Sequence, residues 1–125
     1  MSIKWNASFS VGYPFLDSQH EELFALANLA FDAKTKVELV SCLMSLFKYV
    51  RRYFQDEEQF MKQECYDLYT EHSLLHMVMV ERLGAIALNI GKGNLEVKEL
   101  HKFMSEWLLN HILVEDKKLA DFIKG

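Results

Sequence analysis

Apolar residues recur at intervals of three and four along most of this chain, which is the spacing of one buried face on an α-helix. The clearest stripe runs through Leu39, Leu43, Leu46, Phe47, Val50, Phe54 and Met61. Similar stripes predict helices at about residues 18–34, 36–63, 69–90 and 95–123. With only one proline among 125 residues, little interrupts these helices.

Residues that favour helix ends set the expected boundaries. Gly12 and Pro14 interrupt the pattern near the N-terminus, so residues 1–17 are predicted to form an irregular arm. Ser18, followed by Glu21 at the third position after it, has the pattern of a capping box at the start of the first helix.

The later connections are short. Thr35 and Glu38 form a second capping box, and the turn before the last helix contains Gly91 and Asn94, which suit a C-cap and an N-cap. Short connections make successive long helices antiparallel. We therefore predict an all-α fold, an up-down-up-down antiparallel four-helix bundle, with residues 1–125 forming a single domain.

Composition narrows the setting. A net charge of −4 provides no basic surface for nucleic acid. The N-terminus lacks the apolar segment of a signal peptide, and we find no uncharged apolar stretch of membrane-spanning length. Cys42 and Cys65 belong to no CxxC pattern. We expect a cytoplasmic protein with reduced thiols, and no nucleic acid or membrane as a partner.

Four histidines and two carboxylates fall at one end of the predicted bundle. In an antiparallel bundle, the starts of the first and third helices share an end with the later parts of the second and fourth. Imidazoles and carboxylates from four helices, converging in one layer, indicate a two-metal site. The six residues are His20, Glu57, His72, His76, His111 and Asp116.

Local spacing supports this interpretation, with one exception. His72 and His76 are four residues apart and share a helix face. Asp116 follows His111 by five residues, about 140° around an ideal helix, whereas Glu115 is at about 40°. A role for Asp116 therefore requires a rotated side chain, a distorted helix end or a π-bulge.

Each of these features also has a simpler explanation. A pair of histidines four apart on a helix is usually not a metal site, and Glu57 with Glu58 could form a solvated acidic face. The agreement of four helices in height and direction favours the metal site. His101 serves as an internal control, because it lies about 15 Å along the helix from His111 and is turned by about 80°. We expect it at the surface or boundary.

The chain resembles the hemerythrins, in particular their bacterial branch. That family carries the motifs W…VG…DxQH, HFxxEExxM, HxxxH and WxxxHxxxxD in this order. The matching residues here are Trp5, Val11, Gly12, Asp17, Gln19, His20, Phe54, Glu57, Glu58, Met61, His72, His76, Trp107, His111 and Asp116. The match spans nearly the whole chain. It implies one hemerythrin-like domain with two non-haem iron ions, an oxo or hydroxo bridge, and dioxygen or a small anion as exogenous ligand.

The resemblance also assigns the ligands. It implies that His72, His76 and His111 bind one iron, that Glu57 and Asp116 bridge both, and that His20 binds the second iron. It favours Asp116 over Glu115, which spacing alone did not. Phe24, Phe54, Leu75 and Leu109 are expected to keep the site dry, although plain core packing is an equal alternative for each.

Tyr53 is the main departure from the family pattern, because it stands where a second histidine for the second iron is expected. Our preferred interpretation is that its ring does not bind iron and that water or another small ligand fills the vacancy. One alternative is a phenolate ligand, which would need a shifted backbone. Otherwise Asp56 or Glu58 swings in, or the second iron binds weakly.

These features predict a dioxygen-reactive sensor of oxygen or redox state that autoxidises readily. It could be the sensory part of a signalling protein such as a diguanylate cyclase, with the output domain following Gly125. The alternatives are a reversible oxygen carrier or store, a di-iron peroxidase or NO-processing enzyme, and a structural or zinc-binding bundle. We expect no enzymatic activity in this chain. A ferritin-like oxidase is disfavoured because no glutamate precedes any of the 5 histidines by three residues.

Overall fold

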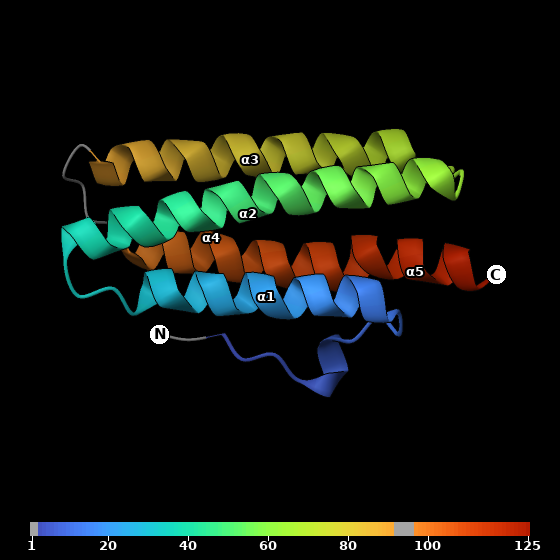
Figure 1. Ribbon diagram of the computed structural model, residues 1–125, viewed down its shortest axis with the longest axis horizontal. Helices are drawn as coiled ribbons and strands as arrows, with labels where there is room; N and C mark the ends of the chain where they lie inside the picture. Colours follow the sequence, from blue (N-terminus) through green and yellow to red (C-terminus); the bar gives the residue numbers. More distant parts are fainter. Residues whose placement is uncertain (1–2, 92–96) are drawn as a thin grey trace.

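Long helices lie side by side and antiparallel in the computed structural model, which describes residues 3–91 and 97–125 (Figure 1). The elements are α1 (Pro14–Phe31), α2 (Lys36–Gln63), α3 (Tyr69–Gly91), α4 (Val97–Asn110), a π-helix (His111–Asp116) and α5 (Lys117–Lys124). The last three form one continuous rod, so the molecule is a four-helix bundle. This confirms the predicted all-α, up-down-up-down architecture.

The N-terminal arm runs beside α1 and contains one short 3-10 helix (Ala7–Phe9). Its aromatic residues pack on the bundle: the ring centroids of Trp5 and Phe9 lie 5.6 Å and 5.5 Å from that of Phe24. At its other end, Lys124 Nζ of α5 donates a hydrogen bond to the Val11 carbonyl at 3.0 Å. The arm therefore joins α1 to the end of the chain's last helix.

Helix α1 begins at Pro14, four residues before the predicted start, and ends at Phe31 rather than near residue 34. Proline suits the first helical position, because the N–H it lacks would have no partner there. The predicted capping box at Ser18 is wrong, since Ser18 lies inside the helix. Asp17 instead holds the arm, accepting hydrogen bonds from the Val11 N–H at 2.8 Å and the Ser10 hydroxyl at 2.6 Å.

The predicted start of α2 is confirmed. The Thr35 hydroxyl accepts a hydrogen bond from the Glu38 N–H at 3.1 Å, as an N-cap does. The end of α2 at Gln63 and the start of α3 at Tyr69 also lie where predicted. The proposed Asn94 cap falls outside the described residues.

Leucines from all four rods fill the centre of the bundle; Leu23, Leu46, Leu83, Leu108 and Leu119 have no measurable exposure. Both cysteines are free, Cys42 partly buried and Cys65 exposed. By length and composition alone, α3 could cross a membrane from Tyr69 to Ile90. That helix nevertheless contains the charged residues Glu81 and Arg82, and it packs against α2 and α4.

Candidate metal centre

The structure brings all six predicted ligands together in the interior, near the end where α1 begins and α2 finishes. Each of them is at most 3% exposed. They are His20 on α1, Glu57 on α2, His72 and His76 on α3, and His111 and Asp116 at the two ends of the π-helix. Because each is carried by a packed helix, its position is set by the bundle and not by a loop.

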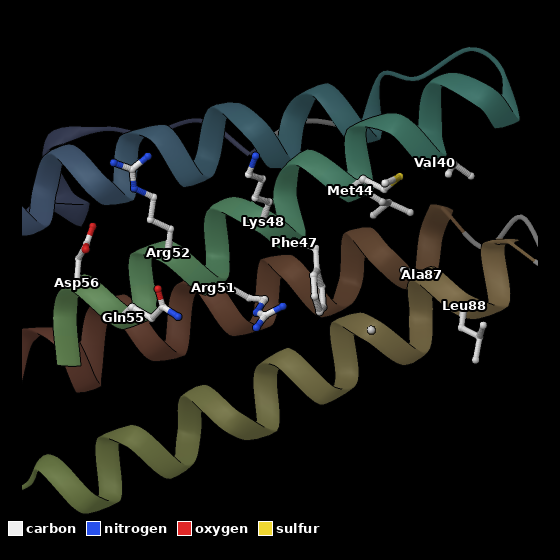
Figure 2. A pocket seen from close by; sticks show the side chains of 12 residues that line it. Val40, Met44, Phe47, Lys48, Arg51, Arg52, Gln55, Asp56, Ala87 and Leu88 are labelled. Atoms are coloured by element: carbon white, nitrogen blue, oxygen red, sulfur yellow. The ribbon is translucent and has the colours of Figure 1, made fainter. Parts of the chain in front are cut away.

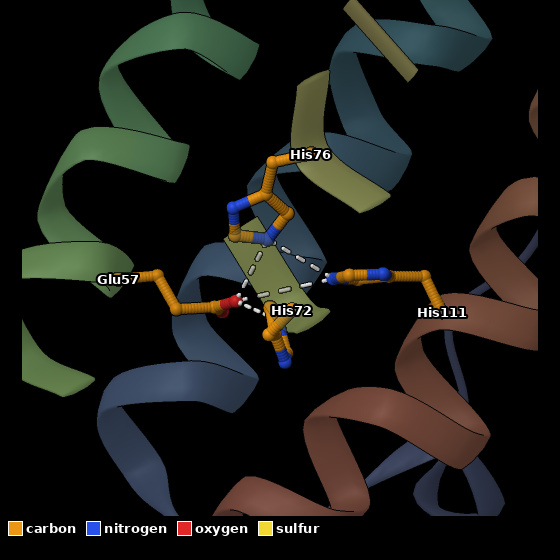
Figure 3. A group of neighbouring side chains, drawn as sticks. All are labelled: Glu57, His72, His76 and His111. Carbon is orange, nitrogen blue, oxygen red and sulfur yellow. Dashed lines mark hydrogen bonds and ion pairs between the residues drawn. The ribbon is translucent and has the colours of Figure 1, made fainter. Parts of the chain in front are cut away.

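Three imidazoles surround one carboxylate in the first half of the site (Figure 3). Glu57 Oε1 lies 2.6 Å from His72 Nε2, 3.1 Å from His76 Nε2 and 3.9 Å from His111 Nε2. The same ring nitrogen of each histidine thus faces the centre. These four side chains have the geometry of a metal-binding group.

Asp116 divides its two oxygens between this group and a second one. Its Oδ1 lies 3.1 Å from both His72 Nε2 and His111 Nε2, whereas its Oδ2 lies 2.7 Å from His20 Nε2. Glu57 also belongs to both groups, and its Oε2 is buried without a hydrogen-bond partner. A carboxylate placed in this way can bridge two metal ions.

The π-helix explains how Asp116 enters the site in place of Glu115. Residues five apart in a π-helix lie one above the other, as residues four apart do in an α-helix. His111 and Asp116 are the first and last residues of this segment, and both are buried. Of the three alternatives predicted for Asp116, the π-bulge is therefore the one that the structure shows.

Tyr53 reaches the second group with its hydroxyl. Its Oη donates a hydrogen bond to Asp116 Oδ2 at 2.8 Å and lies 3.1 Å from His20 Nε2. The side chain is 1% exposed, and its ring is T-shaped to that of His20. Helix α2 is continuous through this position, so the hydroxyl reaches both atoms from a regular backbone.

The alternative in which Glu58 replaces the missing histidine disagrees with its contacts. Glu58 Oε2 lies 2.9 Å from His76 Nδ1, and its Oε1 accepts a hydrogen bond from the Ser73 hydroxyl at 2.9 Å. Glu58 thus holds the outer nitrogen of a first-half histidine. Asp56 is exposed. Sequence reasoning missed this supporting role, although the position of Glu58 one residue after Glu57 was an available clue.

Aromatic rings cover the histidines. Phe54 stacks on His76 at a centroid distance of 3.8 Å, and Trp107 stacks on His111 at 4.5 Å. Phe24 is buried as expected, but Leu75 and Leu109 are 40% and 42% exposed, so their assignment to the dry pocket is wrong. Leu75 precedes His76 by one residue, which turns it about 100° away on the helix.

Mutual contacts set the charge state of these groups in the metal-free protein. Burial and Asp116 would raise the pKa of Glu57, but hydrogen bonds from His111, His72 and His76 hold it at about 2. Burial disfavours the charged form of His72, yet the nearby carboxylates of Asp116 and Glu57 raise its pKa to about 9. Paired charges therefore replace the metal when none is bound.

His101 lies outside the site, as the control predicted. It is partly buried and packs on Phe31, with a ring-centroid distance of 4.8 Å. It belongs to neither of the two metal-binding groups found among the described residues.

A surface groove of about 890 Å³ between α2 and α3 contains none of the six residues (Figure 2). Its lining mixes apolar side chains such as Phe47 and Leu88 with the cations Lys48 and Arg51. The surface groove is therefore separate from the interior site that the six candidate ligands form.

Comparison with known proteins identifies the family and the fold. The family model described as the hemerythrin HHE cation binding domain matches residues 11–123. This chain belongs to the hemerythrin family. It is 26% identical to a bacteriohemerythrin of Stenotrophomonas maltophilia over 97% of this chain and 81% of that protein. It is 28% identical to hemerythrin subunit alpha of Lingula reevii over 91% of this chain and 89% of that one.

Solved structures agree. The crystal structure of a wild-type hemerythrin superposes with a TM-score of 0.88 at 26% identity, covering 98% of both chains. Hemerythrins bind dioxygen, and the two buried donor groups fit the family's metal. Nitrogen and carboxylate donors without thiolates suit iron, and neighbouring donors of an octahedral ion stand roughly 3 Å apart, as most of these do. We conclude that this hemerythrin is a non-haem iron domain that binds dioxygen.

Proposed function

We propose that this hemerythrin domain is a sensor of oxygen or redox state whose two-iron site oxidises readily in air. The observation that carries the proposal is the Tyr53 hydroxyl, which occupies the second half of the site where the family pattern has an imidazole. The second iron is thereby offered an oxygen ligand, from Tyr53 or from water. Oxygen donors are harder than imidazole and favour ferric over ferrous iron.

The chain's own residues divide the work. His72, His76 and His111 would hold one metal, His20 would hold the other, and Glu57 and Asp116, whose oxygens contact both groups, would join them. When bound, the pair of ferrous ions supplies the electrons that dioxygen takes up. Phe54 and Trp107 keep bulk water from the imidazoles by covering their faces. A centre that changes oxidation state in air reports oxygen better than it stores it.

The signal would have to be read elsewhere. We propose a cytoplasmic setting and an output outside these residues, in a signalling protein such as a diguanylate cyclase, with no enzymatic activity in the chain itself. This part rests on the sensor interpretation alone.

The test compares autoxidation of the wild-type protein with that of Tyr53→His. Reduced, iron-loaded protein is mixed with air-saturated buffer, and the growth of the ferric spectrum is followed. Restoring the imidazole should slow oxidation by about tenfold, equivalent to about 1.4 kcal/mol in the barrier. Tyr49→Phe is the matched control, since Tyr49 lies one turn earlier on α2 and bonds the Gln19 carbonyl. Equal rates for wild type and Tyr53→His would contradict the proposal.

Reversible oxygen carriage is the second candidate. It is supported by the similarity over nearly the whole length to hemerythrin subunits and by the full burial of the donor groups. Repeated cycles of oxygenation and deoxygenation separate the two functions. A carrier returns to the same oxygenated spectrum over many cycles, whereas the sensor accumulates ferric protein.

A further inference from the structure

The Tyr53 hydroxyl lies next to two candidate ligands of the second metal. Its hydroxyl oxygen, His20 Nε2 and Asp116 Oδ2 form a triangle with sides of 3.1, 2.8 and 2.7 Å. Adjacent donors on one face of an octahedral ion with bonds near 2.1 Å are separated by roughly 3 Å. The three atoms therefore already have nearly the spacing of such a face.

We propose that Tyr53 Oη is a protein ligand of the second iron in the ferric state, completing a set with His20, Asp116 and Glu57. This inference rests on the proposed two-iron function and names a ligand that replaces the family's histidine. It reverses the preference from sequence alone, in which the ring stays unbound and water takes the position.

Three features of the structure favour the phenol oxygen over water. The Tyr53 oxygen lies in hydrogen-bond contact with both other donors, in the place that a replacement ligand would need. Its ring is held by neighbours, with centroids 5.2 Å from Phe54 and 6.4 Å from Tyr49. The regular backbone of α2 also shows that this reach imposes no distortion.

The charge balance of the site also favours a phenolate ligand. Within residues 3–91 and 97–125, the buried carboxylates are Glu57 and Asp116, and the four imidazoles would bind two ferric ions as neutral groups. Uncompensated positive charge is costly in a buried site. A phenolate adds one negative charge without importing an ion from solvent.

Ligation exchanges one bond for another and involves no electron transfer. The O–H bond of Tyr53 breaks, an oxygen–iron bond forms, and the proton now shared with Asp116 leaves to the solvent. The iron is ferric before and after this step.

The experiment uses ferric protein loaded with two iron ions per chain. The iron is oxidised by an oxidant other than dioxygen, so that the spectrum does not depend on the proposed reaction with oxygen. Ligation predicts an intense phenolate-to-iron absorption band in the visible region, with tyrosine ring vibrations enhanced when that band is excited in resonance Raman spectroscopy. Tyr53→Phe should abolish both. Tyr49→Phe should leave both unchanged, because it keeps the ring that packs on Tyr53 and removes only a hydroxyl that donates to the Gln19 carbonyl. Tyr66→Phe should also leave both unchanged, because Tyr66 packs on His72 in the first half of the site.

Tyr53→His covers the case in which Tyr53→Phe loses iron. It offers the family's own donor, so it should keep two irons and lose the band. A wild-type ferric protein that lacks the phenolate-to-iron band, a band that survives in Tyr53→Phe, or a wild-type chain that holds fewer than two irons would overturn the inference. The readouts are separable. A protein that shows the phenolate-to-iron band but does not react with dioxygen contradicts only the proposed function. A protein that reacts with dioxygen but lacks the band contradicts only the ligation.

Discussion

Glu58 illustrates how single residues outside the donor set prepare it. Its carboxylate accepts a hydrogen bond from His76 Nδ1, which leaves Nε2 free to face the centre, and it is itself held by Ser73. Carboxylates in this position fix the orientation of a ligating imidazole and increase its basicity. Glu58 is therefore a positioning residue.

Glu58→Ala should weaken metal binding in the first half of the site by about 10- to 100-fold. Glu58→Gln should retain most of the affinity, because its amide oxygen can still accept from Nδ1–H. Competitive titration of the metal-free protein with ferrous iron measures both. Gln59→Ala, an exposed neighbour, is the control. Equal affinity for Glu58→Ala and wild type would remove Glu58 from the site.

The metal-free protein should lose stability as the solution becomes alkaline. The pKa of His72 is raised to about 9 and that of His111 to about 10, against burial, by Asp116 and Glu57. A raised pKa stabilises the fold fully below the unfolded value near 6.5, and that stability disappears as pH rises through the folded value. Glu57, with its pKa lowered to about 2, acts in the opposite sense and loses its contribution as pH falls below about 4.5.

Urea unfolding of metal-free protein should therefore give a higher midpoint at about pH 6 than at about pH 9. The His111→Gln variant should show a flatter alkaline decline, because one of the two responsible imidazoles is gone. A midpoint that rises toward pH 9 would contradict the charge pairing described here.

At this scale, the convergence of the six candidate ligands could be predicted, because the height of a side chain in a bundle follows from its position along its helix. The reach of Tyr53 and the partner of Glu58 could not. Both depend on side-chain length and rotation about χ angles, which spacing along the chain does not specify.

At the scale of the element, the π-helix places His111 and Asp116, which are five residues apart, about one helical turn from each other on the same face. Its ends, His111 and Asp116, face the site, while Leu113 and Val114 remain 41% and 46% exposed. The extra residue is thus accommodated on the solvent side. Sequence spacing could show that some distortion was required, but not which kind.

Deleting Val114 should convert the π-helix into a regular α-helix with Asp116 four residues after His111, still on the same face. We expect two irons per chain and an unfolding temperature close to that of the wild type. Deleting Lys102, an exposed residue of α4, is the control. It rotates everything after it by about 100°, so it should lose iron and stability. Iron loss on deletion of Val114 would show that the π-helix itself is needed.

Helix boundaries were predictable where one local contact decides them. Thr35 caps α2 through its own hydroxyl and Glu38, all within four residues. Ser18 is also of a residue type that favours N-caps, but its neighbour Asp17 accepts hydrogen bonds from Val11 and Ser10 of the arm, six and seven residues earlier in the chain. A tertiary contact thus outweighed the local pattern, and α1 begins at Pro14 instead.

At the scale of the whole molecule, the bundle converts four separate stretches of sequence into one interior site. The architecture could be predicted because four long amphipathic segments with short connections have few ways to pack. The course of the arm could not, since its apolar residues follow no helical period. Its placement depends on contacts between Trp5, Phe9 and Phe24 that are distant in sequence.

The attachment of that arm has a consequence for permeability. Trp5 lies near His20, with a ring-centroid separation of 6.3 Å. Besides the packing of Trp5 and Phe9 on Phe24, a few hydrogen bonds fasten the arm: Ile3 with Asn28, Ser10 and Val11 with Asp17, and Val11 with Lys124. Displacement of the arm would break these contacts but would leave the four long helices of the bundle intact. We therefore expect the arm to open locally more readily than the four helices separate, which would expose the His20 side of the site to small solutes first.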